Sequence, residues 1–320
     1  MKKGFFLILI FALLAFISYL YFKEGTLPVN KNDKSTKIFV VPKGESLNNI
    51  IKKLSREQLI RNRIVFYLIV KQLGIEKKIQ AGDYRLSPSM DAYQIAKTLT
   101  HGTLDIWITI IEGLRKEEVA QIVGKNFGIP EIEFIKKAKE GFLFPDTYLI
   151  PKDATLETII KILENNFQKK VDEKLKNQMK EKGLSLEETI IIASLIEREA
   201  KFEEDRPLVA SVIFNRLNEK MKLEIDATVQ YALGYQADEK TWWKKNLTKS
   251  DLEIDSLYNT YKFEGLPPGP ICSPGLSSIK AVINAPNTDY LFYISDKTGK
   301  LHFAKDLPTH NKNIQKYLIK

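Results

Sequence analysis

The stretch "SLEETIIIASLIEREA" (Ser185–Ala200) predicts a helix that carries a carboxylate beside its buried face. Its first residues, "SLEE", fit a capping box, in which Ser185 caps the helix N-terminus and Glu188 reaches back to it. On a helix that turns about 100° per residue, Glu197 falls at the margin of an apolar arc. The arc consists of Leu186, Ile190, Ala193 and Ala200. We therefore expect Glu197 to be partly withdrawn from water.

Periodicity alone leaves two interpretations of Glu197 open. A carboxyl group among Ile and Ala side chains loses hydration, which disfavours its charged form. Such a group can hold a proton near neutral pH and donate it, as the general acid of a glycosidase does. The alternative is a structural glutamate at a helix end, ion-paired with Arg198 or Arg206. Glu199 projects to roughly the opposite side of the helix, so we expect a structural or supporting role for it rather than that of a partner base.

Polar residues downstream of this helix are candidates for binding a sugar. Polar and apolar side chains alternate in "LEIDATVQY" (223–231), which predicts a half-buried strand or the wall of a cleft. Farther on, "YNTYKFEGLPPGPICSPG" (258–275) places tyrosines, amides and hydroxyls beside a loop rich in Gly and Pro. Rings can stack on sugars and polar tips can bind hydroxyl groups, although each tyrosine taken singly is also explained by packing. The candidate substrate-binding residues are Asn215, Asp226, Gln230, Tyr258, Asn259, Thr260 and Tyr261.

The composition is that of a globular protein with room for roughly two domains. The 320 residues are 44% hydrophobic and 28% charged. A single cysteine, Cys272, excludes an internal disulfide framework and a Cys-rich zinc site, and we expect it to be a packing residue. The three histidines lack the spacing of metal ligands, and the sequence contains neither a phosphate-binding loop nor a G-x-S-x-G motif. We therefore expect no metal and no cofactor.

The N-terminal region predicts a membrane anchor. Residues 4–22 carry no formal charge, and as a helix this segment is long enough to cross the hydrocarbon core of a membrane. Lys2 and Lys3 precede it. The positive-inside rule then keeps the N-terminus cytoplasmic and places the remainder outside the membrane. A cleavable signal peptide is the competing interpretation, but no A-x-A site follows the run. The net charge of +9 suits an anionic membrane surface or polymer, but a solvated Lys-rich face explains it as well, and no nucleic-acid-binding motif is present.

The rest of the chain predicts an α+β fold with a small module and a larger catalytic domain. We expect a cytoplasmic stub and transmembrane helix over 1–22, a linker over 23–37, the module over 38–104 and the catalytic domain over 105–320. In the module, "VPKGESLNNIIKKL" (41–54) resembles the opening strand, turn and helix of LysM-type glycan-binding modules. A generic structural αβ subdomain explains it equally well.

Two further patterns in the larger part bear on its fold. A similar strand, turn and helix return at "IWITIIEGLRKEEVAQIVGKNF" (106–127), with Glu112-Gly113 in place of Lys43-Gly44. An amphipathic pattern predicts a helix near residues 156–180.

Several motifs, taken in order, resemble the endolytic murein transglycosylases (the MltG or YceG-like family). These are "EGFLFPDTY", "ASLIEREA", "FNRL", "DATVQY", "YNTY", "GLPPGPI" and the "HF" and "HN" of the C-terminal segment. The resemblance implies that Glu197 is the catalytic residue. It also implies a lyase that cleaves the β-1,4 bond between N-acetylmuramic acid and N-acetylglucosamine in nascent peptidoglycan and leaves a 1,6-anhydro end. The resemblance further implies that the protein acts beside the cell-wall synthases (penicillin-binding proteins) and terminates the growth of glycan strands.

Two other functions fit the same residues. A muramidase-type hydrolase would use the same site with water as the nucleophile and would leave a reducing end. A membrane-tethered, non-enzymatic glycan-binding scaffold would keep Glu197 as a buried structural residue.

Overall fold

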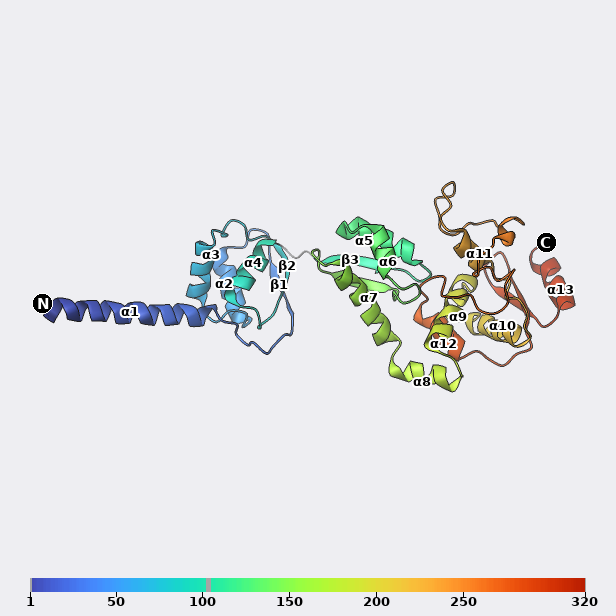
Figure 1. The fold of residues 1–320 in the computed structure, drawn as a ribbon, viewed down its shortest axis with the longest axis horizontal. Coiled ribbons are helices and arrows are strands. Elements are labelled where there is room, and N and C mark those ends of the chain that lie inside the picture. The colour runs from blue at the N-terminus through green and yellow to red at the C-terminus, as the bar shows by residue number, and fades with distance from the viewer. Residues whose placement is uncertain (1, 102–104, 320) are drawn as a thin grey trace. The chain divides into compact units, whose positions relative to one another are not determined.

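A computed structural model describes residues 2–101 and 105–319, and it confirms the predicted mixed α+β class. The chain divides into two compact units, which are coloured blue to teal and green to red in Figure 1. The smaller unit comprises Met1–Ile106 with Leu149–Asp153, and the larger comprises Trp107–Tyr148 with Ala154–Lys320. The predicted boundary after residue 104 lies outside the described residues.

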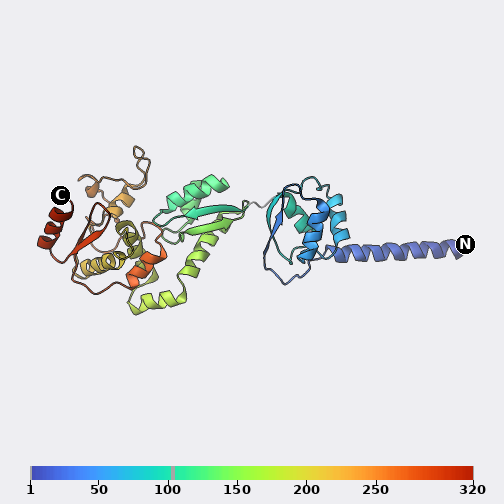
Figure 2. The same ribbon diagram turned by 180° about the vertical axis from the view of Figure 1, so that it is seen from behind.

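The smaller unit packs helices against a two-stranded antiparallel sheet (Figure 2). In this sheet Phe39 lies opposite Tyr84, and both side chains are fully buried. Ser46 caps the helix that follows the first strand and accepts a hydrogen bond from the Asn49 N–H. The elements of this unit are α1 (Lys2–Thr26), β1 (Lys37–Val41), α2 (Leu47–Arg56), α3 (Arg63–Gln72), β2 (Gly82–Leu86) and α4 (Ala92–His101).

Two predictions about this unit stay predictions. Among the described residues, no helix meets the length and apolarity needed to cross a membrane. The membrane anchor is therefore not confirmed, and neither is the likeness to a LysM module.

The first part of the larger unit repeats the order of elements in the smaller one. A strand, two helices, a second strand and a third helix follow one another, and the two strands pair in a sheet of their own. These elements are β3 (Ile106–Ile110), α5 (Lys116–Phe127), α6 (Glu131–Lys137), β4 (Asp146–Ile150) and α7 (Leu156–Lys170). The sequence similarity between the two strand–turn–helix segments therefore corresponds to a repeated arrangement.

The rest of the larger unit is built around α9 (Leu186–Glu199), which packs against α10 and α12 (Figure 1). Every residue from Thr189 to Ile196 is buried, so this helix is surrounded by protein on all sides rather than along one stripe. The predicted capping box is confirmed, since Ser185 and Glu188 exchange two hydrogen bonds. The remaining elements are α8 (Glu173–Glu181), α10 (Arg206–Asn218), α11 (Asp226–Leu233), η1 (Asp251–Glu253), α12 (Leu276–Ile283), β5 (Phe292–Ser295), β6 (Leu301–Ala304) and α13 (Leu307–Tyr317).

Two local predictions were wrong. The single helix expected near 156–180 is two helices, because Asp172 caps a new one by accepting a hydrogen bond from the Leu175 N–H at 2.9 Å. The strand expected in "LEIDATVQY" is instead the short helix α11. Its residues Ala227–Val229 are all buried, and the Thr228 hydroxyl group donates to the carbonyl of Ile225. The alternation of polar and apolar residues covers too few positions to distinguish a strand from a short, partly buried helix.

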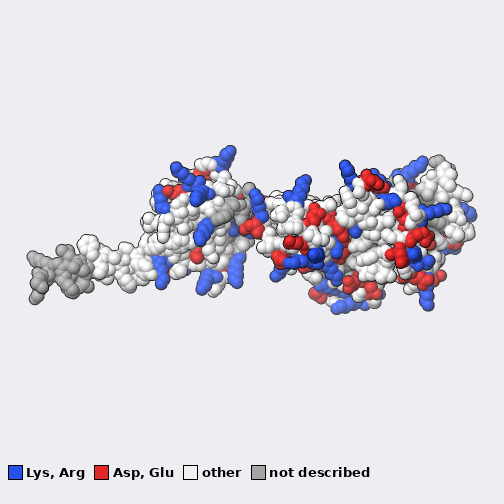
Figure 3. Space-filling view, turned by 45° about the horizontal axis from the view of Figure 1, so that its top comes forward, with Lys and Arg blue, Asp and Glu red and all other residues white. Residues whose placement is uncertain are grey.

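The excess positive charge is confined to one part of the chain. Residues 23–106 hold 15 Lys and Arg against 8 Asp and Glu, whereas residues 107–320 hold 32 of each kind. Figure 3 shows basic side chains dominating the visible face of the smaller unit and acidic clusters on that of the larger one. Apart from Lys2 and Lys3, the net charge of the protein therefore belongs to the smaller unit.

Candidate active site

Glu197 lies in the last turn of α9, and only 5% of its side chain is exposed. Arg206 Nη2 donates to Glu197 Oε1 at 3.1 Å, and the Gly275 N–H donates to Glu197 Oε2 at 2.9 Å. The ion pair with Arg206 considered in the alternative interpretation is confirmed. Arg198 instead stacks on Trp243, with its guanidinium carbon 3.9 Å from the ring centroid. The carboxylate is thus buried and is held by two polar donors.

Arg206 is the first residue of α10, and its guanidinium group faces a second carboxylate. Glu112 Oε2 lies 3.9 Å from the same Nη2 atom that binds Glu197. Among the described residues, Arg206 Nε and Nη1 are buried and find no hydrogen-bond acceptor. This arginine therefore has more donor capacity than its present partners use.

Glu112 comes from the turn between β3 and α5, which is fixed to the loop that precedes α12. The Gly113 N–H donates to the Ser273 carbonyl at 2.9 Å, and the Ser273 N–H donates to the Leu114 carbonyl at 2.8 Å. Burial, and then the charge of Glu197, raises the pKa of Glu112 above its ordinary value, although Arg206 opposes the shift. Half of the Glu112 side chain remains exposed.

Both carboxylates line one open pocket with a volume of about 560 Å³. Its other lining residues come from β3, from β4 and from the segments next to them: Thr109, Ile110, Ile111, Pro145, Asp146 and Thr147. Sequence reasoning missed Glu112 and Gly275, and the only local signal for Glu112 was the repeated strand–turn–helix.

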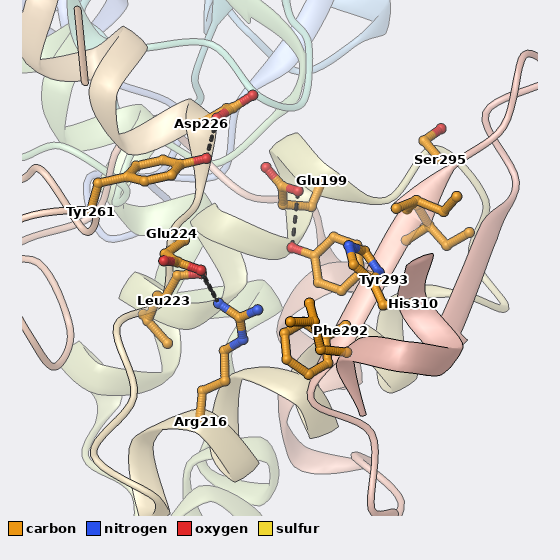
Figure 4. A pocket seen from close by; sticks show the side chains of 13 residues that line it. Glu199, Arg216, Leu223, Glu224, Asp226, Tyr261, Phe292, Tyr293, Ser295 and His310 are labelled. Atoms are coloured by element: carbon orange, nitrogen blue, oxygen red, sulfur yellow. Dashed lines mark hydrogen bonds and ion pairs between the residues drawn. The ribbon is translucent and has the colours of Figure 1, made fainter. Parts of the chain in front are cut away.

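A second pocket, of about 490 Å³, contains Glu199 and shares no lining residue with the first. Figure 4 shows the Tyr293 hydroxyl group pointing at Glu199 and the Tyr261 hydroxyl group pointing at Asp226. These hydrogen bonds measure 2.9 Å and 2.6 Å. Burial raises the pKa of Glu199 to about 7. Two predicted substrate-binding residues, Asp226 and Tyr261, therefore meet here rather than beside Glu197.

The other predicted binding residues use their polar atoms within the protein. Asn215 donates to the carbonyl groups of Thr288 and Tyr290, and Gln230 donates to that of Lys244. These amides are thereby tied to neighbouring loops.

The remaining three predicted residues belong to one segment. Asn259 is fully buried and donates to two carbonyl groups, and the buried Thr260 hydroxyl group accepts a hydrogen bond from the Ile225 N–H. The Tyr258 ring packs on Tyr231, with centroids 4.7 Å apart. A role in substrate binding stays a prediction for all seven residues.

Comparison with known proteins gives a consistent result. Residues 39–316 match the YceG-like family. The chain is 35% identical to the endolytic murein transglycosylase of Bacillus subtilis (strain 168), over 94% of this chain and 90% of that protein. It is 29% identical to the endolytic murein transglycosylase of Streptococcus pneumoniae serotype 2 over 95% of its own length, but it spans only 62% of that relative. A crystal structure of a YceG-like protein from Listeria monocytogenes is similar with a TM-score of 0.59 and 31% identity, over 87% of this chain and 99% of the other.

Proposed function

The chain belongs to the YceG-like family, and we infer that it is a peptidoglycan lytic transglycosylase that cuts within glycan strands. The bond cleaved is the β-1,4 linkage between N-acetylmuramic acid and N-acetylglucosamine. The observation that supports this proposal best is the position of Glu197, a buried carboxylate at the edge of an open pocket. The motif that carries it, "ASLIEREA", resembles the motif of the catalytic glutamate in this family.

The chemistry needs one group that both gives and takes a proton. Glu197 protonates the glycosidic oxygen as the bond to C1 breaks and an oxocarbenium-like sugar forms. The resulting carboxylate then takes the proton of the C6 hydroxyl group while that oxygen closes on C1. The product is a 1,6-anhydro end, and no water is consumed. Because the nucleophile belongs to the same sugar, proximity favours its attack over that of water.

Substrate binding extends over more of the larger unit. The pocket of Glu199 offers the rings of Tyr261 and Tyr293 and the carboxylate of Asp226, a mixture of stacking surfaces and hydrogen-bonding groups that suits a sugar. We assign this pocket to a sugar farther along the strand from the cleaved bond. Thr260 supports the segment that leads to Asp226 in this pocket, since its hydroxyl group accepts a hydrogen bond from the Ile225 N–H.

The site is proposed to act outside the cell, next to the cytoplasmic membrane. The uncharged run over 4–22, preceded by two lysines, supports an anchor with a cytoplasmic N-terminus. The positive charge of residues 23–106 would favour the anionic membrane surface or an anionic wall polymer. Nascent strands are made at this surface, so the cell-wall synthases are the expected partners and termination of strand growth the expected role.

The test uses the full chain and uncrosslinked nascent glycan strands, with products identified by mass spectrometry. Products one water lighter than hydrolysis products, absent with Glu197→Gln, would support the proposal. Ordinary reducing ends would make the protein a muramidase. If the unaltered chain binds strands without cutting them, the scaffold alternative holds.

A further inference from the structure

Two carboxylates share one guanidinium group at the candidate site. Glu197 Oε1 and Glu112 Oε2 lie 3.1 Å and 3.9 Å from the same nitrogen of Arg206. Arg206 is 7% exposed and carries two further buried donors without an acceptor among the described residues. One positive charge can compensate only one of two negative charges at such close range.

Gly275 explains how both carboxylates fit. Its backbone, with φ −74° and ψ 166°, is one that any residue can adopt, so the conformation does not require glycine. A Cβ atom at this position would lie 1.8 Å from Glu112 Oε1 and 2.2 Å from Glu112 Cδ. The missing side chain thus makes room for the Glu112 carboxyl group. The N–H of the same residue holds Glu197.

We propose that Glu112 and Glu197 act as one carboxyl pair on Arg206, and that the pair holds a single proton for the cleavage reaction. Glu112 is then a positioning residue: its negative charge competes for the guanidinium group and keeps the acid of the site protonated. This inference rests on the proposed function. It adds a competing negative charge beside the two polar donors of Glu197, which are Arg206 and the Gly275 N–H.

The proton balance closes without a co-reactant. The proton of the pair moves to the glycosidic oxygen as the C1–O bond breaks. The C6 hydroxyl group gives its proton back to the pair as the new O6–C1 bond forms. The pair therefore ends each turnover with one proton and one negative charge, as it began.

The groups around Glu112 agree with this assignment. From α9 it faces Glu197, and from α10 it faces Arg206. Glu203, in the segment between those helices, adds a further negative charge that raises the pKa of Glu112. Arg198 Nη1 lies beside Gly113, and Asp146 lines the same pocket from β4. Arg206 is the only cation that the described contacts place between the two carboxylates.

The first test is the pH profile of cleavage for the full chain with Glu112→Gln. Without the competing charge, the acid loses its proton at lower pH, so the alkaline limb moves down by about one unit or more. The ratio of cleavage at pH 5 to cleavage at pH 8 should therefore rise about tenfold or more relative to the unaltered protein. Glu203→Gln is the matched control: it removes a nearby charge that does not share the guanidinium group, so the alkaline limb of its pH profile should move less than that of Glu112→Gln.

Gly275→Ala reaches the same prediction by another route. The new methyl group displaces the flexible end of Glu112 and leaves the backbone donor to Glu197 intact. It should reproduce the shift of the alkaline limb, and Gly275→Ala combined with Glu112→Gln should shift no farther than either change alone.

The proposal is overturned if Glu112→Gln lowers cleavage by the same factor at every pH, or leaves the profile unchanged. Glu197→Gln separates this result from a failure of the proposed function. If Glu197→Gln still cuts strands, the function assigned to that residue fails. If Glu197→Gln is inactive but the alkaline limb of the pH profile does not move in Glu112→Gln, only the proposal of a carboxyl pair fails.

Discussion

The two strand–turn–helix segments of the protein share the order of their elements and a left-handed glycine in the turn, but their surroundings differ. In the smaller unit the turn between β1 and α2 carries Lys43 and Gly44, and in the larger unit the turn between β3 and α5 carries Glu112 and Gly113. Both glycines are left-handed, with φ of 82° and 80°. Within the described residues, no heavy atom lies within 4 Å of a Cβ built on Gly44, whereas the equivalent atom on Gly113 meets Arg198 and Glu197. The repeat provides a scaffold, and the helix packed against one copy provides the chemistry.

The largest effect in this comparison is expected from Arg206→Met, which removes the cation between the two carboxylates. The negative charge of the carboxyl pair would then lack its buried counter-charge, and a broken buried pair typically costs about 3–5 kcal/mol. Urea unfolding at pH 8 should show a loss of about 3 kcal/mol. At pH 4, where the carboxyl groups can be protonated, the loss should be smaller. An equal loss at both pH values would mean that Arg206 acts by packing alone.

Exchanging the two turn residues tests the comparison directly. Glu112→Lys places a second cation beside Arg206 and should lower cleavage of nascent strands about 100-fold, the lower end of what proton-transfer groups contribute. Lys43→Glu makes the reverse change on the equivalent turn of the smaller unit. Because no described atom packs on Gly44, cleavage should stay within about twofold. Equal losses for the two variants would break the comparison.

Sequence patterns located the helix of Glu197 but not the partners of its carboxylate. The capping box and the apolar run are local, so they fixed the start of α9 and its buried character. The Gly275 N–H that binds Glu197 is 78 residues away, and Glu112 comes from a different strand–turn–helix. No periodicity can show such contacts, because tertiary packing creates them.

The predicted binding residues illustrate the same limit from the other direction. Asn259 and Thr260 looked like sugar-binding groups because polar residues clustered in the sequence. In the fold their polar atoms bond to loop carbonyls and to the start of α11. A cluster along the chain therefore indicated where polar groups gather but not whether they face a cleft.

Glu199, on the other side of α9, should report on stability rather than on the carboxyl pair. Burial raises its pKa from 4.5 to about 7. The stability of the folded protein is therefore highest, with respect to this group, below pH 4.5, and it is lost as the pH rises to about 7, by roughly 3 kcal/mol in total. Glu199→Gln keeps an acceptor for Tyr293 but cannot ionise. Its stability should rise relative to the unaltered protein between pH 5 and pH 8, as followed by thermal unfolding, and parallel curves would contradict this assignment.

The smallest effects are expected from alanine at the two turn glycines, and here the difference between the variants matters more than either value. Left-handed backbone costs alanine about 1 kcal/mol, and this cost should appear in Gly44→Ala and Gly113→Ala alike. In Gly113→Ala the new Cβ also comes into van der Waals contact with the site, 3.4 Å from Arg198 Nη1 and 3.8 Å from Glu197 Cγ, so a backbone shift that relieves the left-handed strain would disturb these two side chains. Cleavage should therefore fall several-fold in Gly113→Ala and remain unchanged in Gly44→Ala. If both variants lose stability equally and neither loses activity, the turn of the larger unit is a scaffold like its counterpart, and Glu112 is placed by the loop of Gly275 alone.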